Sequence, residues 1–348
     1  MVTGGAGFIG SNFIRYILGV HSGWRVINLD KLTYAGNPAN LKDVQSDPRY
    51  QFVKGDIADR KLMDRLFKEE EVDAILNFAA ESHVDRSILD ASPFIETNVK
   101  GTQALLEVAR QYPLERFIQV STDEVYGSLG ETGKFMEESP LQPNSPYAAS
   151  KAAADLLCWA YHKAYGLPTI ITRSSNNYGP YQFPEKLIPL LIRNALNGKE
   201  LPVYGEGTNV RDWLYVEDNC RAIDLVLQKG RIGEVYNIGG SCEKKNIEVV
   251  ELICDVLEEK LRQSPRLRIH DSRLDDLIEF IADPRGAAHD FRYALDCSKI
   301  KKELGWKPQH DFEEGLKRTI EWYLENQDWL EKLITGEYQE YYEKVYGI

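Results

Sequence analysis

The chain has 348 residues, of which 43% are hydrophobic, and a formal net charge of −12 at pH 7. This length allows one large or two moderate domains with a sizeable core, and the negative charge argues against a nucleic-acid partner because phosphate backbones would be repelled. There is no run of about 18 apolar residues and no basic, apolar leader, so we expect a soluble cytoplasmic protein with no membrane partner.

The first expected element is a short strand that runs into a glycine-rich turn. Glycines at positions 4, 7 and 10 follow Met1-Val2-Thr3 and precede the helix-compatible segment 11–18. Such glycines allow a tight turn, a close approach of the backbone to a pyrophosphate, and close packing of the helix on the strand. Three residues are fewer than the roughly five of an ordinary strand, so a chain that starts within this strand is one interpretation.

The second expected strand, residues 25–29, ends in Asp30, about 20 residues beyond Gly10. An acid at this spacing accepts a hydrogen bond from a ribose 2′-hydroxyl and favours NAD over NADP. A glycine motif alone is weak evidence, but the motif, the helix and the spaced acid together predict a dinucleotide site.

Short apolar strands then alternate with helices through the first half of the chain. The strands expected are 26–29, 51–53, 74–78 and 117–120, with helices such as 62–67 and 102–110 between them. This alternation predicts an α/β fold with a Rossmann-type doubly wound parallel sheet and ligands at the carboxyl ends of its strands. Residues at those ends are Gly4, Asp30, Asp56, Ala79 and Ser121.

After about residue 173 the pattern changes to loops rich in Pro, Gly and Asn, followed by helices such as 187–196 and 247–261. We therefore expect an NAD-binding Rossmann domain over 1–173. Residues 174–348 are expected to form mainly a smaller C-terminal substrate-binding lobe, with some segments returning to the Rossmann domain.

Tyr147 and Lys151 are spaced i, i+4, which places both side chains on one face of a helix. Pro143 and Pro146 mark the helix start, with Asn144 or Ser145 as the cap. A nearby ammonium favours the phenolate form of a tyrosine, so Tyr147 could accept a hydroxyl proton closer to neutral pH, as alcohol oxidation requires. Such a pair is also common on helix surfaces, so this prediction depends on the cofactor site.

These motifs resemble those of the extended short-chain dehydrogenase/reductase family. Its pattern Thr-Gly-x-x-Gly-x-x-Gly matches Thr3 to Gly10, and its downstream Tyr-x-x-x-Lys matches Tyr147 and Lys151. Within that family the chain is similar, nearly end to end, to nucleotide-sugar 4,6-dehydratases. The longer matching stretches are residues 30–37, 79–87, 121–127 and 176–189.

The resemblance implies a lyase that uses tightly bound NAD to convert dTDP-glucose to dTDP-4-keto-6-deoxyglucose. Tyr147 would take the C4 hydroxyl proton while the C4 hydride passes to NAD⁺, and Lys151 would hold the phenolate and the cofactor ribose. The resulting ketone acidifies the C5 proton, which Glu124 would remove while Asp123 protonates the departing C6 hydroxyl. The hydride then returns to C6, and Thr122 would hydrogen-bond the C4 oxygen.

The acid role places two conditions on Asp123. Its pKa must lie well above the reference value of ~3.9, and the neighbouring charge of Glu124 acts in that direction. Adjacent residues of a regular strand point to opposite faces, so both carboxylates can reach one substrate only if the strand has already ended. A solvated strand end or a helix cap is the alternative interpretation.

The resemblance also implies ligand contacts. For NAD these are Gly4, Gly7, Phe8, Ile9, Gly10, Asp30, Lys31, Thr33, Asp56, Ile57, Ala79, Ala80, Ser82, Thr97, Tyr147, Lys151 and Asn177. For the sugar nucleotide they are Ser82, His83, Thr122, Asn176, Lys186, Leu187, Val203, Tyr204, Arg211, Asn246, Arg285 and His289.

Arg211 suits the diphosphate because a guanidinium presents a planar fork to phosphate oxygens. An ion pair with Asp212 or Glu217 is the alternative. For Lys186, the alternative is an exposed charge pair with Glu185.

One loop departs from the family pattern Asp-Arg-Pro-Gly-His-Asp. Here residues 283–290 read Asp-Pro-Arg-Gly-Ala-Ala-His-Asp, so that Arg and Pro are exchanged and two alanines are added. Because Pro284 has a fixed φ and now precedes Arg285, the path of the loop is left open.

The five cysteines are odd in number and never spaced Cys-x-x-Cys, which predicts reduced thiols and no metal site. A homodimer is a family expectation, through the helices containing 104–109 and 156–160, whose apolar faces could instead pack internally. Three rival functions stay open: a sugar-nucleotide 4-epimerase, a dehydratase for a different nucleotide sugar, and a catalytically silent NAD-binding protein.

Overall fold

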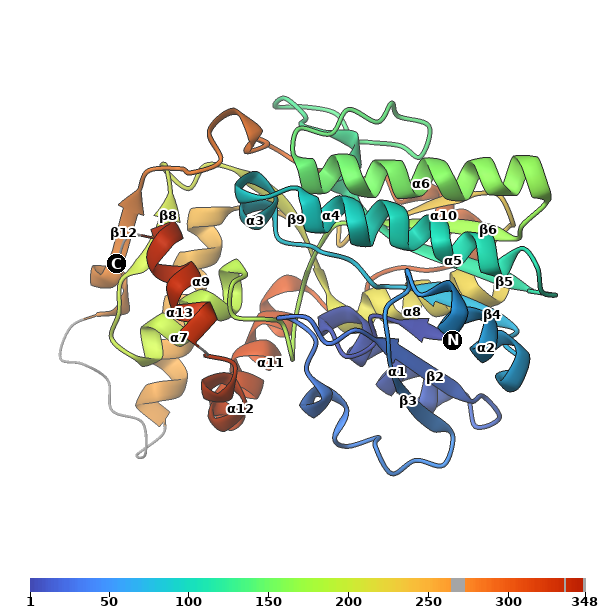
Figure 1. The fold of residues 1–348 in the computed structure, drawn as a ribbon. Helices are drawn as coiled ribbons and strands as arrows, with labels where there is room; N and C mark the ends of the chain where they lie inside the picture. The colour runs from blue at the N-terminus through green and yellow to red at the C-terminus, as the bar shows by residue number, and fades with distance from the viewer. Residues whose placement is uncertain (264–272, 335, 347–348) are drawn as a thin grey trace.

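A computed structural model describes residues 1–263, 273–334 and 336–346 of the chain (Figure 1). Its largest element is a seven-stranded sheet in the order β10-β6-β5-β4-β1-β2-β3, in which every neighbouring pair is parallel. The strands are β1 (Val2–Thr3), β2 (Val26–Asp30), β3 (Tyr50–Lys54), β4 (Ala74–Asn77), β5 (Arg116–Thr122), β6 (Thr169–Ser174) and β10 (Val235–Ile238).

The strand order reverses beside β1, because β2 pairs with one of its edges and β4 with the other. The crevice at such a reversal is where doubly wound sheets bind their ligands. The predicted Rossmann-type fold is confirmed, and the predicted strand-end residues Gly4, Asp30, Asp56, Ala79 and Ser121 all lie around this edge of the sheet.

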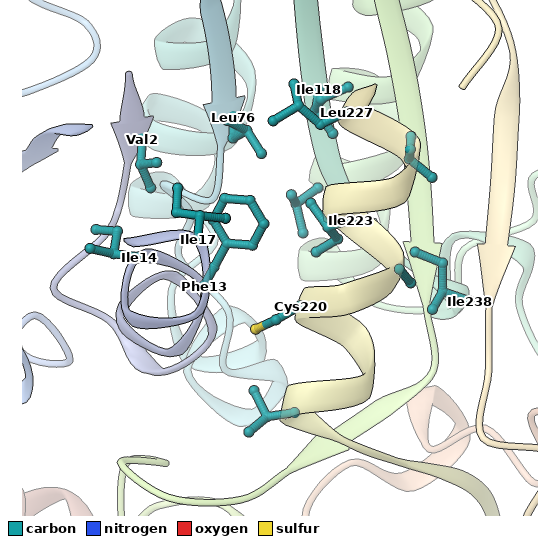
Figure 2. Close-up of a cluster of buried hydrophobic side chains, with 14 of the residues drawn as sticks. Val2, Phe13, Ile14, Ile17, Leu76, Ile118, Cys220, Ile223, Leu227 and Ile238 are labelled. Atoms are coloured by element: carbon teal, nitrogen blue, oxygen red, sulfur yellow. The ribbon is translucent and has the colours of Figure 1, made fainter. Parts of the chain in front are cut away.

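Helices cover both faces of the sheet. On one face, α1 (Phe8–Val20) and α8 (Val216–Lys229) bury apolar side chains against strand residues such as Leu76 and Ile118 (Figure 2). The adjacent strand residues Ile75 and Phe117 belong instead to a cluster with α2, α5 and α6. Neighbouring strand residues thus serve opposite faces, as expected of a sheet buried on both sides.

The helices of this second face are α2 (Arg60–Glu70), α5 (Thr102–Ala109) and α6 (Pro146–Tyr165). Two short helices, α3 (Val84–Leu89) and α4 (Ser92–Phe94), and a π-helical stretch, Ile95–Gly101, lead into α5. The predicted start of α6 is confirmed, and its cap is Ser145, whose hydroxyl accepts from the Ala148 N–H at 3.1 Å.

A smaller lobe is built from later segments and lies beside the sheet (Figure 1). Its strands form two small sheets, β11-β9-β7 and β12-β8. They are β7 (Asn176–Tyr178), β8 (Leu201–Tyr204), β9 (Val210–Tyr215), β11 (Glu243–Lys245) and β12 (Ile278–Ile281). Its helices are α7 (Leu187–Leu196), α9 (Asn246–Gln263), α11 (Phe312–Glu325), α12 (Gln327–Lys332) and α13 (Gly336–Tyr346).

Segments of the second half also return to the large sheet. β10 pairs with β6, and α10 (Ser298–Leu304) packs beside β10 and α8. The chain thus crosses repeatedly between the two regions, and residues from both halves border the edge where the site lies.

All five cysteines are free thiols. None of the helices in the described ranges is long and apolar enough to cross a membrane. The described residues also contain no group of three His, Cys, Asp or Glu side chains that could hold a metal ion.

Candidate active site

The glycine turn between β1 and α1 leaves no room for side chains. Gly4 has a φ of +67°, and a Cβ there would lie 2.6 Å from the Ala79 nitrogen. A Cβ on Gly10 would lie 2.4 Å from the Gly4 carbonyl oxygen. The cap residue of α1 is Gly7, which gives its first N–H groups no side-chain partner. The free N–H groups at the start of α1 can therefore bind phosphate oxygens, because no side chain blocks a close approach.

Replacing Gly4 by alanine is expected to lower the free energy of unfolding by about 2 kcal/mol or more, because the positive φ and the backbone contact both resist a Cβ. NAD affinity should fall as well. Urea denaturation and NAD titration of Gly4→Ala measure the two effects. Gly19→Ala is the control, since a Cβ at Gly19 meets nothing within 4 Å; equal results for the two variants would contradict this account of the turn.

Asp30 ends β2 with both carboxylate oxygens engaged by backbone. Oδ2 accepts from the Ala6 N–H and Oδ1 from the Leu32 N–H, each at 2.8 Å. Burial raises the pKa of Asp30, and these two hydrogen bonds oppose the rise. Lys31 pairs with Asp56 at 2.7 Å on the more exposed rim. Asp30 therefore fixes the turn that carries Ala6 while its side chain borders the pocket.

We call the cavity at the carboxyl ends of β1 to β5 the Gly4 pocket. Every residue predicted for NAD lines it except Asn177, which lies in the neighbouring cavity described below. The lining residues from the prediction are Gly4, Gly7, Phe8, Ile9, Gly10, Asp30, Lys31, Thr33, Asp56, Ile57, Ala79, Ala80, Ser82, Thr97, Tyr147 and Lys151.

The strand β5 ends at Thr122, directly before the two candidate carboxylates. A 3₁₀ helix, Asp123–Tyr126, begins there, and the Thr122 hydroxyl caps it by accepting from the Glu124 N–H at 3.3 Å. Asp123 and Glu124 therefore escape the alternation of a strand. The strand has thus ended before both carboxylates, as the prediction requires, and the helix-cap interpretation describes Thr122 rather than the acids.

Asp123 and Glu124 occupy different environments. The Asp123 side chain is 2% exposed, and its Oδ2 has no hydrogen-bond partner among the described residues. Burial, then the charge of Glu124, raises the pKa of Asp123 well above its usual range. Burial also raises the pKa of Glu124, but Lys186, Arg285 and Arg211 oppose that rise. Such a difference divides two carboxyl groups into an acid and a base.

Tyr147 and Lys151 lie on the inner side of α6, at the Gly4 pocket. The Lys151 ammonium donates to the Val120 carbonyl at 2.6 Å. The expectation that Lys151 lowers the Tyr147 pKa is wrong for the protein alone, because burial and the Glu124 charge raise the pKa of Tyr147. Burial also lowers the pKa of Lys151, and Asp155, one turn further along α6, opposes that.

The second cavity, which we call the Arg211 pocket, continues from the Gly4 pocket between the large sheet and the smaller lobe. Gln182, Glu185 and Lys186 line both, and Glu124 lines the Arg211 pocket. The residues predicted for substrate that line it are His83, Asn176, Lys186, Leu187, Val203, Tyr204, Arg211, Asn246, Arg285 and His289.

Arg211 is held at the wall of this pocket by neutral groups. Its guanidinium donates to the carbonyls of Val210 and Asp290, at 2.8 and 2.9 Å, and lies 4.5 Å from the centre of the Tyr293 ring. Asp212, proposed as an alternative partner, accepts from the Cys242 N–H at 2.7 Å. The positive charge of Arg211 is thus presented to the pocket.

The altered loop, residues 283–290, still brings Arg285 to the Arg211 pocket. Arg285 pairs with Asp85 of α3, and its guanidinium lies 5.5 Å from the centre of the Tyr204 ring. His289 contacts Asp283 within the loop. The exchange of Arg and Pro therefore does not turn Arg285 away from the cavity.

Two predicted substrate residues lie elsewhere: Ser82 lines the Gly4 pocket, and Thr122 lines neither cavity, although its hydroxyl donates to Asp123 Oδ1 at 3.3 Å. Asp123 itself also lines neither cavity. Lys186 is not in an exposed pair; Glu185 beside it is buried. Sequence reasoning missed several lining residues, namely Glu81, Asp85, Gln182, Glu185, Asp290 and Tyr293. The first four lie inside the stretches that match the family, and this match was the sequence feature that could have predicted them.

Comparisons with known proteins agree with this geometry. Residues 1–319 match the family model described as GDP-mannose 4,6 dehydratase. The chain is 54% identical to the dTDP-glucose 4,6-dehydratase of Xanthomonas campestris pv. campestris (strain B100), over 97% of each chain. It superposes with a TM-score of 0.88 on dTDP-glucose 4,6-dehydratase from Streptomyces venezuelae with NAD bound, at 53% identity over 95% of this chain and 98% of that one.

A UDP-glucose 4-epimerase from Thermotoga maritima shares the fold at lower identity. Its TM-score is 0.82 and its identity 29%, over 94% of this chain and 98% of that one.

Proposed function

This chain belongs to the dehydratase family that the GDP-mannose 4,6 dehydratase model describes, and we propose that it dehydrates dTDP-glucose to dTDP-4-keto-6-deoxyglucose with NAD. The observation that carries the proposal is the pair Asp123 and Glu124, of which Asp123 is buried with a raised pKa and Glu124 opens to the Arg211 pocket. This is an acid and a base in adjacent positions, as elimination of water requires.

The Gly4 pocket fits NAD. Its glycines leave a cradle that a Cβ at position 4 or 10 would fill, which suits a closely held pyrophosphate. Asp30 lies where a ribose hydroxyl would meet a carboxylate. When bound, NAD supplies a reversible hydride acceptor. The side chains of Tyr147 and Lys151 border the pocket where such a reaction would occur.

The protein's own groups handle the protons. Tyr147 accepts the C4 hydroxyl proton once its phenol is ionised, a form that the positive charge of Lys151, on the same helix face, would favour. Once C4 is a carbonyl, the C5 hydrogen becomes acidic and Glu124 removes it. Asp123, whose pKa burial raises well above its usual range, gives its proton to the C6 hydroxyl as water leaves. Arg211, Lys186 and Arg285 supply positive charge for the diphosphate.

The 4-epimerase alternative uses the same fold but has no elimination step. It therefore has no use for an acid at Asp123 beside a base at Glu124. Relatives more than half identical to this chain carry the dehydratase name, whereas the epimerase is far more distant.

Mass spectrometry of the product tests the proposal. Purified protein incubated with dTDP-glucose should yield a product lighter by one water, with no added NAD consumed, because the hydride is returned within each turnover. A product of unchanged mass would favour epimerisation. Tight NAD binding without turnover on any nucleotide sugar would favour a silent binding protein.

Lys186 gives a prediction about pH dependence. Its ammonium opposes the rise in the Glu124 pKa. Glu124 must be ionised to act as a base, so activity falls as the pH drops through its pKa. Lys186→Met should raise that pKa and move the acidic limb of the kcat profile to higher pH, by about one unit. Lys68→Met, at an exposed ion pair, is the control; an unmoved limb in Lys186→Met would contradict the assignment of Glu124 as the base.

The proposal includes the division of the chain into an NAD-binding domain, 1–173, and a mainly substrate-binding lobe, 174–348. It also includes thymidine as the nucleotide base, which the names of the relatives support. Turnover of CDP-, GDP- and UDP-linked glucose beside dTDP-glucose tests this choice.

We further propose a cytoplasmic homodimer. The apolar residues of the 104–109 helix are buried inside the chain, so that half of the predicted interface is internal packing. On α6, Leu156 and Trp159 are 57% and 51% exposed, and Ile95 nearby is 44% exposed. These apolar side chains support a dimer through α6, which sedimentation velocity can test.

A further inference from the structure

Glu185 is a buried carboxylate at the seam between the two cavities. It lies in the segment just before α7 and lines both the Gly4 pocket and the Arg211 pocket. Its side chain is 1% exposed. The proposed reaction uses Glu124 and Asp123 for proton transfer and leaves Glu185 without a role.

Two side chains from distant parts of the chain converge on this carboxylate. Arg86 of α3 donates to Oε2 at 3.0 Å, and the Tyr34 hydroxyl donates to Oε1 at 3.1 Å. The Arg86 guanidinium also lies 4.0 Å from the centre of the Tyr34 ring, so that the three groups contact one another. Tyr34 belongs to the loop after Asp30 that borders the Gly4 pocket. The cluster therefore joins the cofactor side to the sugar-nucleotide side.

Two residues predicted for substrate, His83 and Lys186, meet the backbone at Glu185. The Glu185 carbonyl meets Nε2 of His83 at 3.2 Å, and the next residue, Lys186, donates from its ammonium to the Ser82 carbonyl at 2.9 Å. Lys186 lines both cavities. Because a lysine ammonium on its flexible four-carbon stem samples many rotamers, its placement depends on how firmly the backbone is held. The contacts of Glu185 hold that backbone.

We propose that Glu185 is a positioning residue, whose carboxylate ties Tyr34 and Arg86 to the segment that carries Lys186 and so sets the Lys186 ammonium against the sugar nucleotide. The inference rests on the proposed function for its substrate. A buried carboxylate whose partners all come from other segments can also be a simple structural ion pair. The two readings differ in what they predict for ligand affinity.

The test compares Glu185→Gln with Glu258→Gln. Glu258 is a matched control: its side chain is 10% exposed, pairs with Arg262 at 2.7 Å and accepts from the Leu274 N–H at 2.9 Å, on α9 away from both cavities. Isothermal titration calorimetry gives the Kd for thymidine diphosphate, and steady-state kinetics gives KM and kcat for dTDP-glucose.

For Glu185→Gln we expect Kd and KM to rise about ten-fold while kcat stays within about three-fold, because ground-state binding is lost. For Glu258→Gln both constants should stay within about two-fold of the wild type. A Glu185→Gln variant whose Kd stays within that range, or whose kcat alone falls, would overturn the proposal.

Tyr34→Phe keeps the test decisive if Glu185→Gln fails to fold. It retains the ring beside Arg86 and removes only the hydroxyl that donates to Glu185, so Kd should rise about three-fold. No change in Kd would overturn the proposal. The Kd measurement needs no turnover, so wild-type protein that binds thymidine diphosphate without dehydrating dTDP-glucose would refute the proposed function alone.

Discussion

Replacing Asp123 by asparagine is expected to lower kcat for dehydration by about 10²–10⁴-fold, the usual contribution of a positioned general acid. Asn has nearly the same shape but no proton to give to the leaving hydroxyl. Because burial raises the pKa of Asp123 and so favours its neutral form, replacing it by a neutral amide should change the free energy of unfolding by less than about 1 kcal/mol. The measurements are kcat with dTDP-glucose and urea denaturation.

The steps before elimination should survive in Asp123→Asn. Tyr147, Lys151 and Glu124 are untouched, so dTDP-glucose recovered from heavy water should carry deuterium at C5. Asp43→Asn is the control, because Asp43 is an exposed partner of Arg15, at 2.6 Å, outside both cavities. Turnover of Asp123→Asn within about ten-fold of this control would show that another group protonates the leaving hydroxyl.

Replacing Tyr147 by phenylalanine is expected to lower kcat by a similar factor, about 10²–10⁴, but at an earlier step. Without the phenol the C4 hydroxyl keeps its proton, no carbonyl forms, and the C5 hydrogen stays unreactive. The ring packs edge-on against Phe94 with centres 6.2 Å apart, so phenylalanine preserves the packing. Loss of turnover should therefore come with loss of C5 exchange, measured by mass spectrometry of recovered substrate.

Tyr178→Phe is the control for Tyr147→Phe. Tyr178 is also buried, and its hydroxyl donates to the Phe312 carbonyl at 3.2 Å outside both cavities. If the sugar exchanged its C5 hydrogen as fast with Tyr147→Phe as with this control, a different base would be removing the proton of the C4 hydroxyl. Together the Asp123 and Tyr147 variants separate oxidation from elimination.

The sequence predicted five of the seven strands of the large sheet because their signals are local, whereas β6 and β10 were not among the strands expected. Apolar strands such as 117–120, the glycine spacing from Gly4 to Gly10, and the acid at position 30 each depend on a few neighbouring residues. The same holds for the start of α6, where Pro146 follows the capping Ser145. The predicted helices 187–196 and 247–261 appear as α7 and α9, the first with identical bounds.

The electrostatics of the site could not be read from the sequence. The pKa of Tyr147 rises because the fold buries the phenol and brings the Glu124 charge near it, and neither effect follows from the i, i+4 spacing of Lys151. Similarly, the strand end at Thr122 depends on how β5 meets its neighbours in the sheet. Asp123 is the first residue after the strand, and the sequence alone did not establish where the strand ends.

Contacts between residues far apart in the chain were also not predictable from the sequence. Asp85 and Arg285 are 200 positions apart, and Tyr34 and Glu185 are 151 apart, yet each pair is in contact. The path of the whole chain determines such pairs. The sequence of each segment alone therefore does not predict which distant residue its polar side chains will contact. The altered loop at 283–290 illustrates this, since its Arg285 finds Asp85 despite the exchanged proline.

The proposed dehydration requires that a carbonyl formed at C4 makes the hydrogen at C5 removable by Glu124. Turnover of dTDP-glucose in heavy water, followed by NMR of the product, tests this most directly. We predict one deuterium at C5 of the 4-keto-6-deoxy sugar, because the carbon is reprotonated from solvent after elimination. Product that carries only hydrogen at C5 would contradict the mechanism.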